Sequence, residues 1–181
     1  WEDFIKRYRR SYFGALWAVI SFAVIGVAIL FFFSAVTGDE MQDGVSYIVL
    51  GFLAFQLLSN IIQDGCNVFT QSSSWITSAR LPLSLFIFRD ITRILIVFVF
   101  NAVGAAIILI WHGYSLPPGF LWCLTGLVAT VLNAFWVYLF LGVLVARFKD
   151  LFHLITAILR LGFFISPVMW VPTGEGMRSL I

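Results

Sequence analysis

The sequence predicts an all-α integral membrane protein, with an N-terminal amphipathic helix followed by five transmembrane helices. Composition is the first observation: 61% of the 181 residues are hydrophobic and 11% are charged, whereas soluble domains carry about 25% charged residues. The second is charge spacing, because long uncharged stretches separate short charged ones, with no charge between Arg10 and Asp39. The third is the uneven distribution of Lys and Arg over the connections, which is typical of multi-pass membrane proteins.

Residues 1–12 form the first expected element, a helix that lies in the membrane interface. Apolar side chains recur at i, i+3, i+4, i+7 and i+11 and share one face: Trp1, Phe4, Ile5, Tyr8 and Tyr12. The other sides carry the charged residues Glu2, Asp3, Lys6, Arg7, Arg9 and Arg10. Interface helices bury their rings at the acyl boundary and hold cations near lipid phosphates. We therefore expect Trp1, Phe4, Tyr8, Arg9 and Arg10 to contact the membrane.

Five uncharged or nearly uncharged stretches follow, and each is close to the ~20 residues that cross a hydrocarbon core. The expected spans are residues 13–36, 45–63, 94–111, 120–146 and 151–170. The third helix can extend back to Leu83 and protrude into water, because Pro82 is a natural helix start. Ser166 and Pro167 are expected to end or kink the fifth, because proline removes a helix hydrogen bond.

The Lys and Arg residues outside the spans divide nine to one between the two sides of the membrane. One side holds Lys6, Arg7, Arg9, Arg10, Arg80, Arg89, Arg93, Arg147 and Lys149, and the other holds Arg178. Cytoplasmic connections carry the excess of positive charge. The chain is therefore predicted to start in the cytoplasm.

The segment 64–81, on the cytoplasmic side, is the longest connection and carries an apolar stripe at helical spacing. The stripe comprises Val68, Phe69, Ser72, Trp75, Ile76 and Ala79. Polar residues take the other face: Gln71, Ser73, Ser74 and Ser78. A short helix parallel to the membrane, a helix docked on a partner, and a solvated loop resting on lipid all fit this pattern. We favour the partner, because an apolar stripe on a cytoplasmic segment requires a cover.

The sequence lacks the motifs of an enzyme or a metal site. It contains no GxxxxGK[ST], HExxH, CxxC or GxSxG pattern. The two histidines, His112 and His153, fall at opposite membrane faces, and Cys66 and Cys123 fall on opposite sides, so neither a shared metal nor a disulfide is expected. We therefore predict no catalytic residue and no metal ligand in this chain.

Arg160 is the strongest local signal, because it lies ten residues into the fifth span, about 15 Å deep. His153, Thr156 and Arg160 lie at i, i+3 and i+7 and form one polar stripe. We expect this stripe to line a hydrated pathway for a polar or anionic substrate, or a subunit interface. A structural contact with the carbonyl groups of another helix, or snorkelling, is the alternative.

Other residues in the spans are expected to serve helix packing. Interhelical hydrogen bonding is the expected role of the polar residues at depth, Gln56, Asn60, Asn101 and Asn133. Close approach of helices is the expected role of the single glycines Gly26, Gly104, Gly126 and Gly142.

Four motifs occur in order along the chain: RYRRSYFGALWAVI, then SARLPL, then ARFKDL, then FFISPVMWVP. In this order the sequence resembles the membrane subunits of ABC-2 type exporters, in the branch that exports polysaccharide, O-antigen, capsule and teichoic acid. The resemblance covers essentially the whole chain. It implies a homodimer of six-span subunits in the bacterial cytoplasmic membrane, which passes a lipid-linked glycan and contacts membrane lipids but no nucleic acid.

The resemblance also implies separate ATPase subunits, which bind ATP and Mg while this chain binds no cofactor. The implied ATPase-coupling residues lie in the connection after the second span and in the one after the fourth: Trp75, Ile76, Arg80, Arg147, Lys149 and Asp150. Since the family continues through a sixth span, we expect this chain to be an incomplete stretch that would not form a working channel. The alternatives are an ABC-2 exporter of a drug or lipid, and a channel or secondary-transporter component not driven by ATP. The internal repeats and paired midplane charges of secondary transporters are not evident here.

Overall fold

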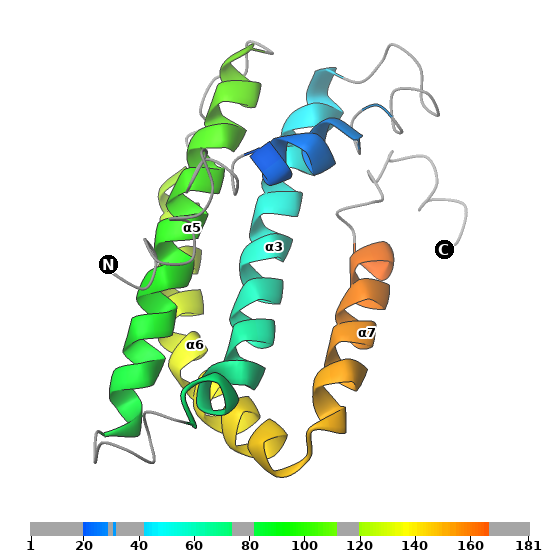
Figure 1. The fold of residues 1–181 in the computed structure, drawn as a ribbon. Coiled ribbons are helices and arrows are strands. Elements are labelled where there is room, and N and C mark those ends of the chain that lie inside the picture. Colours follow the sequence, from blue (N-terminus) through cyan, green and yellow to red (C-terminus); the bar gives the residue numbers. More distant parts are fainter. Residues whose placement is uncertain (1–19, 29–30, 32–41, 74–81, 112–119, 167–181) are drawn as a thin grey trace, which may run out of the picture.

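The computed structural model describes residues 20–28, 31, 42–73, 82–111 and 120–166. Four helices form an up-and-down bundle (Figure 1): α3 (Gln42–Gln71), α5 (Leu83–Trp111), α6 (Phe120–Arg147) and α7 (Asp150–Ile165). A further helix covers residues 20–28. The described residues contain no strand, and the expected all-α membrane class is confirmed.

Three of these helices are long and apolar enough to cross a membrane. Their qualifying stretches are Ile48–Gln71, Leu83–Ile110 and Cys123–Arg147. The early start expected for α5 is confirmed, since the Leu85 amide donates to the Pro82 carbonyl at 3.1 Å and the helix begins at Leu83. Large apolar side chains such as Leu132, Trp136 and Phe140 are exposed along α6, as a lipid-facing surface requires.

Helix α3 lies at the centre of the bundle and contacts α5, α6 and α7. Two buried clusters hold it there. The first joins α3, α5 and α6 through Leu57, Ile61, Val68, Phe69, Phe86, Ile87, Ile94, Ala134 and Tyr138. The second joins α3 and α5 to the helix at 20–28 through Phe22, Val49, Phe52, Leu53, Ala105 and Leu109.

The chain reversals bring the basic residues of three helix termini to one end of the bundle. This end, called the basic end below, carries Arg89 and Arg93 of α5, Arg147 at the end of α6, and Lys149 before α7. The C-terminus of α3 lies at the same end (Figure 1).

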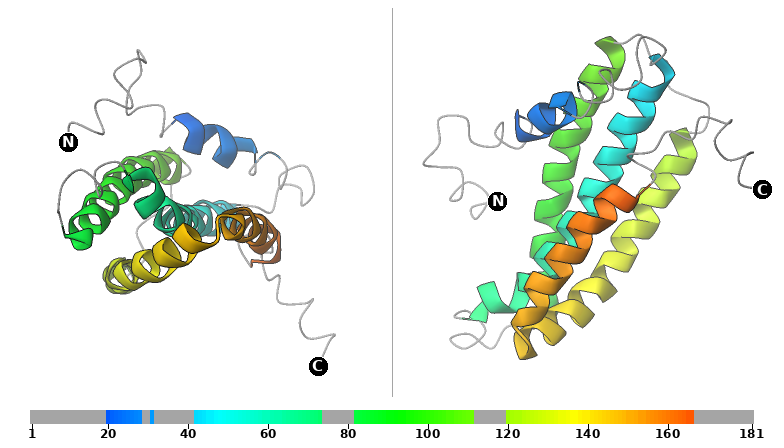
Figure 2. Two further views of the ribbon diagram at one scale, coloured as in Figure 1. Left: turned by 60° about the horizontal axis from the view of Figure 1, so that its bottom comes forward. Right: turned by 90° about the vertical axis from the view of Figure 1, so that its right-hand side faces the viewer.

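Helix α3 continues past the expected end of the second span at residue 63, as far as Gln71. Figure 2 shows its last part turned away from the axis of the rest of the helix. Val68, Phe69 and Ser72 are buried there, and Val68 and Phe69 pack on α6 at Gly142. The first half of the apolar stripe is therefore covered by the chain itself, whereas the expectation was a partner; the second half, including Trp75 and Ile76, lies outside the described residues.

Of the expected span 13–36, the structure describes residues 20–28, which are helical, and residue 31; the rest of that span lies outside the described residues. The helix at 20–28 lies across the bundle at the end opposite the basic end, whereas the other helices run along the bundle (Figures 1 and 2). Phe22 anchors this helix on α3, because its buried ring stacks on Phe52 with centroids 5.3 Å apart.

Helix α7 has 16 residues, or about 24 Å, and ends before the expected limit at residue 170. Ser166 is extended, with ψ 141°, and its amide donates to the Gly162 carbonyl at 2.8 Å. Pro167 accounts for this ending, because the residue before proline avoids the helical region and proline itself has no N–H donor. The expected termination at Ser166 is therefore confirmed.

Candidate functional site

A pocket of about 360 Å³ lies between α3, α7 and the helix at 20–28. Its size falls in the range of about 300–1,000 Å³ that is typical of small-molecule sites. It is lined by Ile25, Phe52, Phe55, Gln56, Ser59, Asn60, Gln63, Thr156, Leu159, Arg160, Phe163 and Phe164. We call it the α3–α7 pocket.

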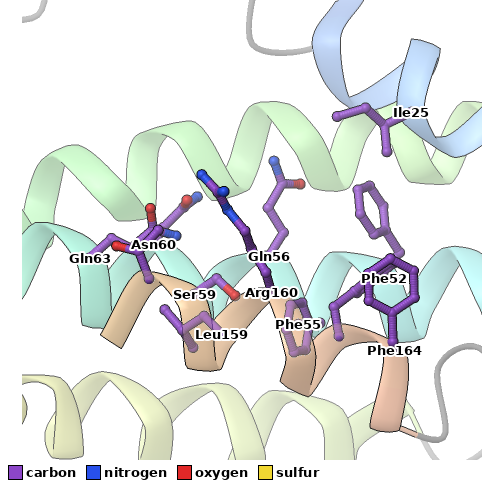
Figure 3. Close-up of a pocket in the computed structure, with 12 residues that line it drawn as sticks. Ile25, Phe52, Phe55, Gln56, Ser59, Asn60, Gln63, Leu159, Arg160 and Phe164 are labelled. Carbon is purple, nitrogen blue, oxygen red and sulfur yellow. The ribbon is translucent and has the colours of Figure 1, made fainter. Parts of the chain in front are cut away.

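The α3–α7 pocket has a polar half and an aromatic half, and the two follow one another along the bundle (Figure 3). The polar half lies toward the basic end and contains Gln56, Ser59, Asn60, Gln63, Thr156 and Arg160. The aromatic half lies toward the opposite end and contains Phe52, Phe55, Phe163 and Phe164. The phenylalanines contact one another, since the ring of Phe163 lies 5.1 Å from Phe55 and 6.0 Å from Phe52.

Two of the three residues expected to line a pathway lie in this pocket. Arg160 extends from α7 across α3, between Asn60 and Gln63 on one side and Gln56 on the other (Figure 3). Thr156 also lines the pocket, although its hydroxyl donates to the Phe152 carbonyl of its own helix at 2.8 Å. His153 is exposed and contacts the ring of Phe152, so the structure does not place it in the pocket.

The polar face of α3 was not recognised as a site from the sequence. Gln56, Ser59, Asn60 and Gln63 lie at i, i+3, i+4 and i+7, which is the spacing of one helix face. This periodicity is the signal that indicates the face, whereas the role expected for Gln56 and Asn60 is interhelical hydrogen bonding. One such contact exists: the Asn101 amide of α5 donates to Gln56 Oε1 at 3.5 Å. Asn133, by contrast, donates to the Ala129 carbonyl within α6.

A second polar site, the α3–α5 ion network, lies at the basic end. Arg93 Nη2 is 2.8 Å from Asp64 Oδ2 and 4.0 Å from Asp90 Oδ1. Arg89 Nη2 is 3.3 Å from Asp90 Oδ1 and donates to Ser72 Oγ at 3.2 Å. Two arginines and two aspartates balance in charge, which reduces the cost of burying Asp90, whose side chain is 4% exposed.

The ion network connects the body of α3 to its turned end. Asp64 lies within α3 and Ser72 directly follows its last residue. Arg93 binds Asp64 and Arg89 binds Ser72, and these two arginines lie one turn apart on α5. Gly65 packs on Tyr138 of α6, where an added Cβ would lie 3.4 Å from the Tyr138 backbone. The geometry of the segment entering residues 74–81 is therefore fixed by contacts to both α5 and α6.

Of the expected ATPase-coupling residues, the structure describes those between α6 and α7. Arg147, Lys149 and Asp150 are exposed in a tight turn, which the Leu151 amide closes by donating to the Phe148 carbonyl at 3.2 Å. The remaining expected site residues lie outside the described residues: Trp75, Ile76 and Arg80 of the cytoplasmic segment, and Trp1, Phe4, Tyr8, Arg9 and Arg10 of the interface helix.

A helical bundle that contains three helices of membrane-spanning length and apolar composition defines a multi-pass membrane protein. The chain belongs to the ABC-2 type transporter family, which matches residues 1–174. Members of this family are the membrane components of ABC exporters; they are permeases and work with ATPase subunits. No curated protein matches the sequence.

Proposed function

We propose that this chain is the transmembrane subunit of an ATP-driven exporter of lipid-linked polysaccharide in the bacterial cytoplasmic membrane. A second copy of the chain completes the channel, and separate ATPase subunits bind ATP and Mg. The family supports the exporter class. The order of RYRRSYFGALWAVI, SARLPL, ARFKDL and FFISPVMWVP supports the glycan branch.

The α3–α7 pocket is the observation that carries the proposal. Amide side chains and a guanidinium can hydrogen-bond sugar hydroxyl groups, and the apolar faces of sugar rings can stack on phenylalanine. A drug exporter of mainly apolar cargo has less use for four polar residues on one face of a buried helix, because each costs free energy to desolvate. The pocket therefore favours a polar cargo over an apolar one.

The basic end faces the cytoplasm in this proposal, because Lys and Arg mark cytoplasmic connections. The ATPase then contacts the exposed turn at Arg147, Lys149 and Asp150, together with the segment that contains Trp75, Ile76 and Arg80. The helix 1–12 lies in the same leaflet, beside the place where a lipid-linked substrate enters.

Export of surface polysaccharide tests the substrate. Cells whose own copy of this gene is deleted are complemented with the full-length protein or with its Arg160→Leu variant, and surface glycan is quantified. We expect the variant to lower export about tenfold or more, the effect of losing one charge-assisted hydrogen bond of about 1.5–3 kcal/mol. Unchanged glycan in the deletion strain, with increased drug sensitivity, would contradict the proposal and favour a drug exporter.

Co-purification of the ATPase tests the coupling surface. We expect Trp75→Asp to abolish recovery of the ATPase with the tagged full-length chain, because a carboxylate would replace an apolar contact. Ser74→Asp is the matched control, since Ser74 lies on the polar face of the same predicted helix. Equal recovery with both variants would remove Trp75 from the coupling surface.

A further inference from the structure

Among the described residues, those that line the α3–α7 pocket include a positive charge and no negative one. Arg160 is the one charged residue among those that line it, and none of them is an aspartate or glutamate. In the part of the chain that the structure describes, no ion pair or hydrogen bond holds the Arg160 guanidinium. Arg160 is exposed, so its guanidinium is accessible to a ligand that enters the pocket. A cation at membrane depth is costly unless it is paired or hydrated, and an anionic ligand would supply the pairing.

The groups around Arg160 are suited to an oxyanion with several oxygen atoms. Gln56, Asn60 and Gln63 each carry an NH₂ group with two donors, and arginine carries five donors in a planar fork. The Ser59 hydroxyl is buried on the same face and has no hydrogen-bond partner among the described residues. Arginine with amide and hydroxyl donors binds phosphate well, because the guanidinium contacts two oxygen atoms at once.

The aromatic half continues directly from this polar half and offers no donor. Phe52, Phe55 and Phe163 form a connected set of rings, and Ile25 of the helix at 20–28 lies above Phe52 (Figure 3). A ligand that fills both halves must therefore carry its anion at one end and an apolar chain at the other.

We propose that the α3–α7 pocket binds the phosphate or diphosphate group of a lipid, with Arg160 on the phosphate and the first part of the lipid chain along Phe52, Phe55 and Phe163. This inference rests on the proposed function, because a phosphate-linked lipid cargo is what brings such a group to this depth. The polar half holds the phosphate or diphosphate that joins the lipid to its sugars. The pocket therefore recognises this group and not the sugars attached to it.

Native mass spectrometry of the purified full-length protein with its ATPase tests the proposal. The probes are a polyprenyl diphosphate, a phosphatidate, a polyprenol without phosphate, and inorganic phosphate. We expect the two phosphorylated lipids to bind and the Arg160→Gln variant to weaken them roughly 10- to 100-fold, the range for one lost charge-assisted hydrogen bond. Arg160→Lys is expected to restore part of the affinity, because it keeps the charge without the planar fork.

A matched pair of amide variants controls for folding. Asn60→Ala removes a donor from the pocket, and we expect it to weaken the phosphorylated lipids several-fold. Asn133→Ala makes the same change on α6, outside the pocket, and should leave binding unchanged. Equal binding by wild type and Arg160→Gln would overturn the proposal. Polyprenol binding as tightly as its diphosphate, or inorganic phosphate binding as tightly as the lipids, would overturn it as well.

The binding assay and the export assay separate the two proposals. If phosphorylated lipids bind the purified protein in an Arg160-dependent manner, but the deletion strain still exports its surface glycan normally, the pocket is supported and glycan is refuted as the exported substrate. Loss of glycan export in the deletion strain, with no Arg160-dependent binding, would support the exporter and refute the pocket as its lipid-phosphate site.

Discussion

Gly142 is a residue of α6 that the side chains of the turned end of α3 approach closely. A Cβ at Gly142 would lie 2.8 Å from side-chain atoms of both Val68 and Phe69, whereas a Cβ at Gly126, on the same helix, would have nothing within 4 Å. The sequence identifies both glycines as small residues suited to helix packing, but only the register of α3 against α6 distinguishes them. That register depends on contacts between residues more than seventy positions apart, which no local pattern encodes.

Gly142→Ala is expected to lower the free energy of unfolding by about 1–3 kcal/mol, the usual cost of forcing a methyl group into a filled interface. Gly126→Ala, the matched control, should be neutral or slightly stabilising, because alanine is the better helix former. Titration of the purified protein with a denaturing detergent measures both. Equal unfolding free energies for the two variants would mean that the turned end of α3 does not pack on α6 as the structure has it.

At the scale of elements, the helices bounded by strong local signals were predicted best. α5 begins beside Pro82 and α6 ends at Arg147, close to the expected limits, because proline and charge mark helix and membrane boundaries directly. The helix at 20–28 was not predicted in its position, since burial of Phe22 on α3 is a tertiary effect. Likewise Arg89, Asp90 and Arg93 served only to limit a span, because their pairing with Asp64 requires the register of α3 against α5.

The pairing of α3 with α5 through Asp64 and Arg93 can be measured by a double-mutant cycle. We expect Asp64→Asn and Arg93→Gln each to destabilise the protein, and the double variant to lose less than the sum, with a coupling energy of about 0.5–3 kcal/mol. The side chains are 32% and 22% exposed, so water weakens the pair only in part. Exchange of the two charges, Asp64→Arg with Arg93→Asp, should restore part of the stability; a coupling energy near zero would contradict the pairing.

At the scale of the whole molecule, the alternating helix directions bring the basic residues near the ends of α5, α6 and α7 to one end of the bundle. This uneven charge predicts which end of the bundle faces the cytoplasm. Lys149 lies in the exposed turn at the basic end. Ser115 belongs to the connection 112–119, which joins the last residue of α5 to the first residue of α6. Both of these helix ends lie at the end of the bundle opposite the basic end. Positive charge is retained on the cytoplasmic side during insertion. The fold and the charge distribution therefore predict one orientation, with Lys149 inside the cell and Ser115 outside.

Single-cysteine labelling of the full-length protein in living cells tests this orientation. In a background with Cys66→Ala and Cys123→Ala, we expect Ser115→Cys to react with a membrane-impermeant maleimide in intact cells and Lys149→Cys to react only after permeabilisation. Labelling is normalised to that in detergent-solubilised membranes, which corrects for cover by a bound ATPase. The reverse pattern would place the basic end outside the cell, where no ATPase could reach the α6–α7 turn, and would contradict both the orientation and the coupling surface proposed for it.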